Sequence, residues 1–179
     1  MFFAHYLDLT RRKLKENAAN IITLINLSLG CISIFFTLKG TTDWALIMIF
    51  VAALADRLDG MVARKLRIES EIGKQLDSLC DLVSFGVAPA TLIYVTSLSA
   101  LGYTGMFFCI IFIICGGYRL ARFNITENHG FFHGLPITAA GCILTFFALF
   151  TEIIHTAIFI ILTVVLSLAM ISSTKIKKM

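Results

Sequence analysis

The stretch that decides the fold of this chain is DRLDGMVARKLRIESEIGKQLDSLCD, residues 56–81. It follows the apolar run WALIMIFVAALA at residues 44–55 and precedes the run LVSFGVAPATLIYV at residues 82–95. Neither flanking run alternates polar with apolar residues as membrane β-strands do, so each indicates a membrane-spanning helix. Four aspartates therefore lie where two apolar helices meet the edge of a membrane.

The composition of the whole chain indicates an integral membrane protein. Of its 179 residues, 58% are hydrophobic and 15% are charged, whereas a soluble domain is usually ~45–50% apolar with about a quarter of its residues charged. Six apolar segments approach the ~20 residues that a membrane-spanning helix needs. They cover residues 21–38, 44–63, 76–98, 104–120, 137–150 and 153–171. We therefore predict an all-α fold, an integral membrane bundle of six transmembrane helices.

The N-terminal residues differ in character from this bundle. Residues 1–17 combine aromatic side chains such as Phe2 and Phe3 with four basic residues between positions 11 and 15. This pattern is typical of an amphipathic helix that lies on an anionic membrane surface. We predict a juxtamembrane segment over residues 1–17 and one membrane domain over residues 18–179.

The basic residues predict the orientation of the bundle. All but Lys39 of the 15 Lys and Arg fall in the N-terminal segment, in the second and fourth connections or in the C-terminal tail. Basic residues stay on the cytoplasmic side of a membrane. We therefore expect a multi-pass protein of the cell membrane with both termini and the aspartate-rich stretch facing the cytoplasm, and we expect no nucleic-acid partner.

The spacing of the four aspartates predicts a shared site. Asp56 and Asp59 are three residues apart, and Asp77 and Asp81 are four apart, so each pair lies on one face of a helix. Carboxylates that converge near a low-dielectric region repel one another and need a counter-charge. Mg²⁺ and Mn²⁺ take oxygen ligands and would supply it, and two such ions suit displacement at phosphorus. The alternative is a solvated turn in which acidic and basic residues pair.

Residues between the aspartates suit a nucleotide. Gly60 and Gly73 remove side chains where a bulky ligand approaches the backbone. Arg64 follows on the same stretch and carries donors that match phosphate oxygens.

The whole pattern, Asp-x2-Asp-Gly-x2-Ala-Arg-x8-Gly-x3-Asp-x3-Asp, resembles the signature of the CDP-alcohol phosphatidyltransferases. Its positions here are Asp56, Asp59, Gly60, Ala63, Arg64, Gly73, Asp77 and Asp81. The resemblance implies six transmembrane helices, a cytoplasmic-facing site and a homodimer. It also implies a reaction in which the hydroxyl of a small alcohol attacks a CDP-linked lipid and CMP leaves.

The same resemblance implies roles for these residues. Asp56, Asp59 and Asp77 would ligate two divalent ions, and Asp81 would complete the metal site and act as the catalytic general base toward the incoming hydroxyl. The CDP pocket would be lined by Gly60, Ala63, Arg64 and Gly73.

Other stretches resemble the phosphatidylserine synthase branch of that family. They are NIITLINLSLG at residues 20–30, FGVAPA at 85–90, CGGYRLARFN at 115–124, and FFHGLP with ITAAG at 131–141. This resemblance implies CDP-diacylglycerol as the donor and L-serine as the acceptor. Arg119 and Arg122 lie three residues apart on one helix face and suit a carboxylate, and Asn124 suits a further hydrogen bond.

Several alternatives remain open at this point. The acceptor can instead be glycerol 3-phosphate or inositol phosphate, and the donor can be an archaeal ether lipid. The two arginines can equally anchor a helix end at the lipid headgroups. A divalent-cation transporter is the competing function class, since acidic residues in membrane helices often mark ion pathways. The roles of His133 and of the Gly116–Gly117 pair are also open.

Overall fold

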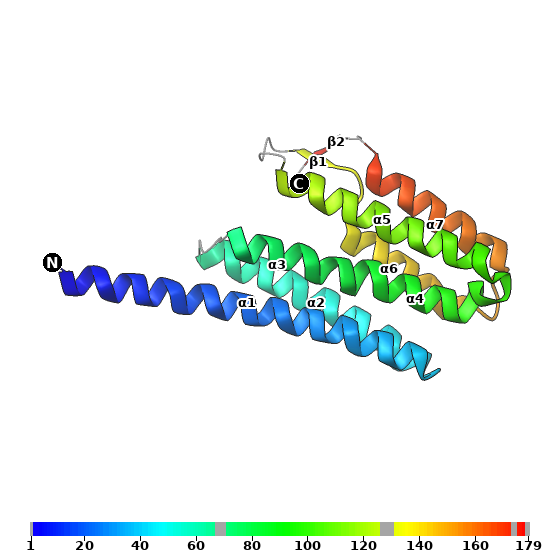
Figure 1. Cartoon of the computed structure of the whole chain (residues 1–179), viewed down its shortest axis with the longest axis horizontal. Coiled ribbons are helices and arrows are strands. Elements are labelled where there is room, and N and C mark those ends of the chain that lie inside the picture. The colour runs from blue at the N-terminus through cyan, green and yellow to red at the C-terminus, as the bar shows by residue number, and fades with distance from the viewer. Residues whose placement is uncertain (1, 67–70, 126–130, 173–174, 178–179) are drawn as a thin grey trace.

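The chain forms a bundle of helices that run along one common direction, as the computed structural model shows (Figure 1). The structure describes residues 2–66, 71–125, 131–172 and 175–177. Within these ranges, the structure describes only the backbone of residues 2–19, 59, 62–66, 131–133 and 175–177. Each of the six predicted apolar segments is helical over most of its length.

The helices follow one another through short connections. Their bounds are α1 (Phe2–Leu38), α2 (Thr42–Leu66), α3 (Glu71–Asp81), α4 (Ala88–Ile93), α5 (Tyr103–Ile125), α6 (Ile137–Phe147) and α7 (Thr156–Ile171). A π-helical segment, Leu82–Val87, joins α3 to α4, and a second one, Tyr94–Leu98, leads into the 3₁₀ turn Ser99–Leu101. Residues from Glu71 to Leu101 thus form one continuous helical rod.

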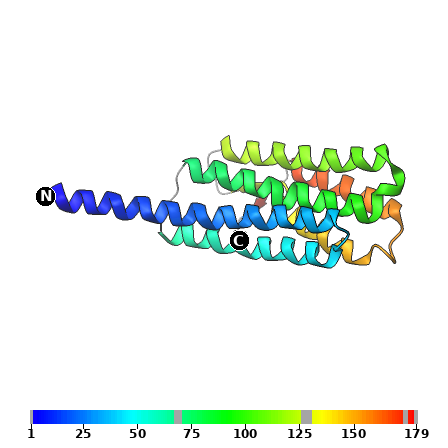
Figure 2. The same ribbon diagram turned by 60° about the horizontal axis from the view of Figure 1, so that its bottom comes forward.

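The first two helices form a hairpin. Gly40, at φ 77°, supplies the left-handed residue that ends α1. Inside the hairpin, the buried Ser33 hydroxyl donates to the Ala45 carbonyl at 2.9 Å. Figure 2 shows α1 lying along α2 and continuing past the rest of the bundle at its N-terminal end. Residues 1–17 were predicted to form a separate juxtamembrane helix; from Phe2 they continue into the first apolar segment as one helix, and their position on a membrane surface stays a prediction.

Apolar side chains lie both inside and outside the bundle. Phe85, Phe112 and Phe159 are among the largest fully buried side chains and join the rod, α5 and α7 in one core. Large apolar side chains such as Ile114 and Leu168 are exposed on the outer surface. A helix that is apolar on every side is typical of a membrane span.

The structure supports an integral membrane protein with several apolar helices. Among the residues that the structure describes, three helices are long and apolar enough to cross a membrane: Asn20–Leu38, Glu71–Leu101 and Tyr103–Ile125. Two shorter apolar helices, Ile137–Phe150 and Thr156–Ile171, correspond to the fifth and sixth predicted segments. The second predicted segment lies in α2, whose C-terminal half carries Asp56, Arg57 and Asp59.

Two short strands were not predicted. β1 (Phe131–His133) pairs antiparallel with β2 (Lys175–Lys177), with His133 opposite Lys175. Next to this pair, Gly134 adopts φ 75° against the carbonyls that end α7, where most side chains would be strained. Among the residues that the structure describes, this pair is the only β-structure, and it joins the segment before α6 to the C-terminal tail.

Pro89 accounts for the irregular helix that follows α3. A proline has no N–H to give to the carbonyl four residues back, which here belongs to Phe85. The hydrogen-bond ladder widens just before it, and the N–H of Ala88 donates to the Val83 carbonyl, five residues back. The turn directly after Asp81 is thus π-helical.

Two glycines set how closely neighbouring helices approach the π-helical segment. A Cβ at Gly30 would lie 2.8 Å from Ser84 Cα, and a Cβ at Gly141 would lie 2.9 Å from Phe85 Cα and would also clash with the Phe85 carbonyl oxygen. Backbone atoms cannot move aside as the end of a flexible side chain can. The segment is therefore held between α1 and α6 at backbone-contact distance.

We expect Gly141→Ala to lower the free energy of unfolding by about 1–3 kcal/mol, the usual cost of overpacking. Thermal unfolding in detergent measures the effect. Gly117→Ala is the matched control, because its Cβ would meet only the Leu82 methyl groups at 3.8 and 3.9 Å. A Gly141→Ala protein that melts at or above the wild-type temperature would contradict the close packing.

Candidate metal centre

Three of the four predicted aspartates meet in the structure. Asp56 on α2 and Asp77 and Asp81 on α3 each place a carboxylate oxygen within 4.8 Å of the other two. The predicted convergence of the two helix faces is confirmed for these three residues. Asp59 lies on α2 one turn after Asp56, but its side chain is outside the described residues.

The three carboxylates differ in burial, and one oxygen of the deepest carboxylate has no hydrogen-bond partner among the described residues. Asp81 is 8% exposed, whereas Asp56 and Asp77 are half-buried. The Oδ1 oxygen of Asp81 has no hydrogen-bond partner among the described residues. An unsatisfied buried carboxylate oxygen costs several kcal/mol unless a cation meets it. The donor set fits Mg²⁺ or Mn²⁺, which prefer carboxylate oxygens.

The neighbouring helix α1 holds the end of the aspartate helix in place. Ser84, one turn beyond Asp81, is buried and donates to the Asn26 carbonyl at 3.1 Å. Gly30 lets α1 reach the backbone of Ser84 at this point. The contact fixes the depth at which Asp81 enters the bundle.

Arg119 is the cation that the structure places near the carboxylates. It lies on α5, is 8% exposed, and attracts Asp81 electrostatically. Its guanidinium carbon lies 5.5 Å from the centre of the Phe123 ring, a cation–π contact. Its Nε has no hydrogen-bond partner among the residues described, so the group retains a donor for a ligand.

Arg122 has a different environment from Arg119. Its Nη1 donates to the Ile171 carbonyl at 3.0 Å and its Nη2 donates to the Ser172 carbonyl at 3.3 Å. These carbonyls end α7, where a helix lacks internal donors. The spacing predicted that both arginines bind the carboxylate of the acceptor, and that role stays a prediction. In the structure, Arg119 and Asp81 attract each other, and Arg122 hydrogen-bonds to the end of α7.

Asn124 also makes contacts that the sequence did not reveal. Its amide nitrogen donates to the Ser78 hydroxyl at 2.9 Å and to Gln75 Oε1 at 3.3 Å. Ser78 and Gln75 belong to α3, so Asn124 connects the end of α5 to the helix that carries Asp77. Polar residues forty-odd positions apart give no sequence signal of such a contact.

The remaining predicted residues are placed only in part. Gly60 on α2 and Gly73 on α3 are half-buried, and Ala63 and Arg64 lie on α2 with side chains outside the described residues. The roles of these four in binding CDP stay predictions, as does any role of His133, whose backbone lies in β1.

The two adjacent glycines of α5, Gly116 and Gly117, have different surroundings. A Cβ at Gly116 would lie 2.6 Å from Ile137 Cδ1, so Gly116 admits α6, whereas Gly117 has ordinary space around it.

Sequence reasoning missed Asn26 and Thr145 as interior polar residues. Asn26 is fully buried and neither side-chain polar atom has a hydrogen-bond partner among the described residues, and Thr145 Oγ1 is likewise unsatisfied. The available signal for Asn26 was an amide in the middle of an apolar run, which is costly in a membrane.

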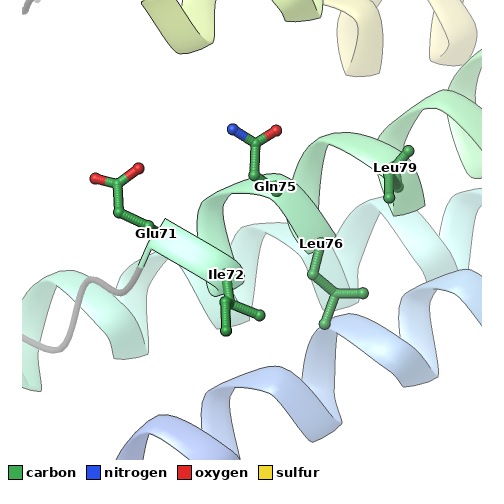
Figure 3. Close-up of a pocket in the computed structure, with 5 residues that line it drawn as sticks. All are labelled: Glu71, Ile72, Gln75, Leu76 and Leu79. Carbon is green, nitrogen blue, oxygen red and sulfur yellow. The ribbon is translucent and has the colours of Figure 1, made fainter.

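A shallow hollow lies on the outer side of α3 (Figure 3). It is lined by Glu71, Ile72, Gln75, Leu76 and Leu79. Figure 3 shows Ile72 and Leu76 pointing toward α1, while Glu71 and Gln75 project from the other side of α3. The aspartate cluster does not contribute to this lining, so the hollow is separate from the metal centre.

The chain is similar to a family of known proteins over most of its length. Residues 16–170 match the family model described as CDP-alcohol phosphatidyltransferase.

Three curated relatives share 37–40% of their aligned residues with the chain. A CDP-diacylglycerol–serine O-phosphatidyltransferase of Bacillus subtilis is 40% identical over 68% of this chain and 69% of its own length. An archaetidylserine synthase of Methanothermobacter thermautotrophicus is 39% identical over 86% of this chain and 66% of its own length. A CDP-diacylglycerol–serine O-phosphatidyltransferase of Methanocaldococcus jannaschii is 37% identical over 89% of this chain and 73% of its own length.

Proposed function

Because this chain belongs to the CDP-alcohol phosphatidyltransferase family, we propose that it transfers the phosphatidyl group of CDP-diacylglycerol to the hydroxyl of L-serine. The products are phosphatidylserine and CMP. The observation that carries the proposal is the buried cluster of Asp56, Asp77 and Asp81 in a chain whose relatives are named for transfer to serine.

The aspartates would hold the divalent ions of this reaction. Asp56, Asp77 and Asp81 offer converging oxygens, and Asp59 is the fourth ligand in the proposed set. When bound, two Mg²⁺ or Mn²⁺ ions supply positive charge that balances the pyrophosphate of the donor and the charge developing on CMP.

Asp81 is the proposed general base. In the transfer, the serine oxygen forms a bond to the phosphorus next to the lipid, and the bond from that phosphorus to the CMP oxygen breaks. The proton of the serine hydroxyl passes to a carboxylate oxygen of Asp81. Its burial beside Asp56 and Asp77 keeps this carboxylate at the point where the two substrates would meet.

Arg119 is the proposed acceptor-binding residue. A buried guanidinium with an unpartnered Nε suits the carboxylate of serine, which a plain alcohol lacks. Arg122 and Asn124 support the surrounding structure through the contacts described above. Gly60, Ala63, Arg64 and Gly73 remain the proposed lining of the CDP pocket.

We expect Arg119→Ala to raise the KM for serine about 10–100-fold, the loss of one charged hydrogen bond, with a smaller change in kcat. Initial rates of CMP release over a range of serine concentrations give both constants. Arg122→Ala is the matched comparison, and it should lower thermal stability more than serine affinity because its donors cap α7. Equal rises in KM for the two variants would restore the paired-arginine interpretation.

The proposed setting is a six-span membrane bundle whose active site faces the cytoplasm. Asp56 lies toward the end of α2 and Asp77 lies near the start of α3. The basic residues of the connection between them favour the cytoplasmic side. Both termini would lie on that side, and we propose a homodimer as the assembly.

A second donor is favoured by one relative. The Methanothermobacter thermautotrophicus protein is named archaetidylserine synthase, so an ether-linked archaeal lipid bearing the same CDP group is the alternative donor. Serine is the acceptor in either case, and the carboxylate cluster would treat the two donors alike because they share the pyrophosphate.

The test is an acceptor panel with purified protein. CDP-diacylglycerol and Mn²⁺ are combined in turn with serine, glycerol 3-phosphate and inositol phosphate, and CMP release is measured. We expect CMP release with serine and none with the other two acceptors. Release with glycerol 3-phosphate but not serine would assign another acceptor. If none of the three acceptors gave CMP release with either donor, and the protein carried Mn²⁺ into proteoliposomes, a transporter would be favoured instead.

A further inference from the structure

A cluster of polar side chains, Lys74, Gln75, Ser78 and Asn124, joins α3 to the end of α5 beside the metal centre. Both amide atoms of Asn124 lie within hydrogen-bonding distance of the Ser78 hydroxyl, Nδ2 at 2.9 Å and Oδ1 at 3.3 Å. Asn124 Nδ2 also reaches Gln75 Oε1 at 3.3 Å, and Lys74 Nζ donates to the Asn124 carbonyl at 2.8 Å. We name these four residues the α3–α5 latch.

The latch occupies the face of α3 next to the one that carries the aspartates. Lys74 and Ser78 are four residues apart and share one helix face, and Asp77 and Asp81 share the neighbouring one. Each residue of a helix is turned by about 100° from the one before it, as 3.6 residues complete a turn. A small rotation of α3 about its axis would therefore carry both carboxylates away from Asp56.

Packing constrains the start of α3 less than the rest of the rod. The described residues of α3 include exposed apolar side chains, Ile72 at 75% and Leu79 at 62% exposure, and only Cys80 and Asp81 are buried. Packing against α1 and α6 holds the rod from Ser84 onward, whereas the start of α3 buries little and depends more on contacts with neighbouring side chains. Directional hydrogen bonds to a neighbouring helix are then the means of orienting it.

We infer that Asn124 is a positioning residue for the metal centre. Its hydrogen bond to Ser78 fixes the rotation of α3 so that Asp77 and Asp81 face Asp56. The sequence-based expectation that Asn124 binds the acceptor stays the competing interpretation, and the kinetics below distinguish the two. The activity consequences rest on the proposed function, whereas the metal-binding consequences depend only on the aspartate cluster.

The test measures Mn²⁺ binding directly, by the electron paramagnetic resonance signal of free Mn²⁺ in titrations of the purified protein without substrates. We expect Asn124→Ala and Ser78→Ala each to weaken Mn²⁺ binding about 10–100-fold, the usual effect of losing a group that orients a metal ligand. The double variant should bind Mn²⁺ no more weakly than Asn124→Ala alone, because that variant already removes the contact with Ser78.

Two further variants separate positioning from loss of folding. Ser78→Thr keeps the hydroxyl and should keep Mn²⁺ affinity within about threefold, a conservative rescue of Ser78→Ala. Ser28→Ala is the control elsewhere, since the exposed Ser28 hydroxyl bonds only to Leu24 of its own helix, at 2.8 Å, among the contacts described. It should bind Mn²⁺ like the wild type.

Kinetics then distinguish positioning from acceptor binding. Weaker Mn²⁺ binding in Asn124→Ala with the KM for serine within about twofold of wild type, at saturating Mn²⁺, supports the latch. A raised KM for serine with unchanged Mn²⁺ binding would overturn the inference, and so would reduced thermal stability with unchanged Mn²⁺ binding. If the wild type released no CMP with serine, the proposed function would be wrong. The Mn²⁺ titrations would still test the role of the latch, because they need no substrate.

Discussion

Asp81→Asn is expected to lower kcat for CMP release by about 10²–10⁴-fold, the range for removing a general acid or base. Asparagine has nearly the same shape but cannot accept the serine proton at neutral pH, and it is a poorer metal ligand. The residue is 8% exposed and lies against Asp56 and Asp77. The measurement is kcat at saturating serine and Mn²⁺.

Stability gives the control for this substitution. Removing one of three mutually repelling buried carboxylates relieves unfavourable charge in the metal-free protein. Asp81→Asn should therefore unfold at the wild-type temperature or above it when EDTA is present. Asp43→Asn, on the exposed first turn of the same α2 that carries Asp56, should change neither property. Activity within about tenfold of wild type would remove Asp81 from the proposed chemistry.

Removing divalent metal is expected to abolish transfer altogether. Three carboxylates within 4.8 Å of one another repel both each other and the anionic pyrophosphate of a CDP-lipid. EDTA should therefore bring CMP release to background, and added Mn²⁺ or Mg²⁺ should restore it. Rates measured at buffered metal concentrations give the dependence.

The same ions should also stabilise the fold. A ligand present at 100 times its Kd adds about 2.7 kcal/mol to the free energy of unfolding, so the thermal midpoint should rise with Mn²⁺ concentration. Asp56→Asn should reduce this rise, while Asp43→Asn should retain it. Full activity in EDTA, or a midpoint insensitive to Mn²⁺ in the wild type, would contradict a metal centre at these residues.

The aspartate cluster was predictable because helical periodicity is a local property. The three- and four-residue spacings place aspartates on single faces of α2 and α3, and the few residues between those helices bring the faces together. The same locality allowed the apolar segments to be located from the chain alone.

Contacts between helices far apart in the chain were not predictable. Arg119 and Arg122 share a helix face, yet one lies near Asp81 and the other binds Ile171 and Ser172. Asn124 reaches Ser78 across 46 positions. The pairing of β1 with β2 likewise depends on where α7 delivers the C-terminal tail.

The sequence by itself determined which residues can act chemically: apolar helices, four aspartates at helical spacing and the arginines beside them. The tertiary structure decided what each side chain faces. Chemical type and helical phase are encoded over a few neighbouring residues, whereas a partner 46–50 positions away is selected by the packing of whole helices. The packing is why Arg119 and Asp81 attract each other while Asn124 hydrogen-bonds to the helix that carries Asp77 and Asp81.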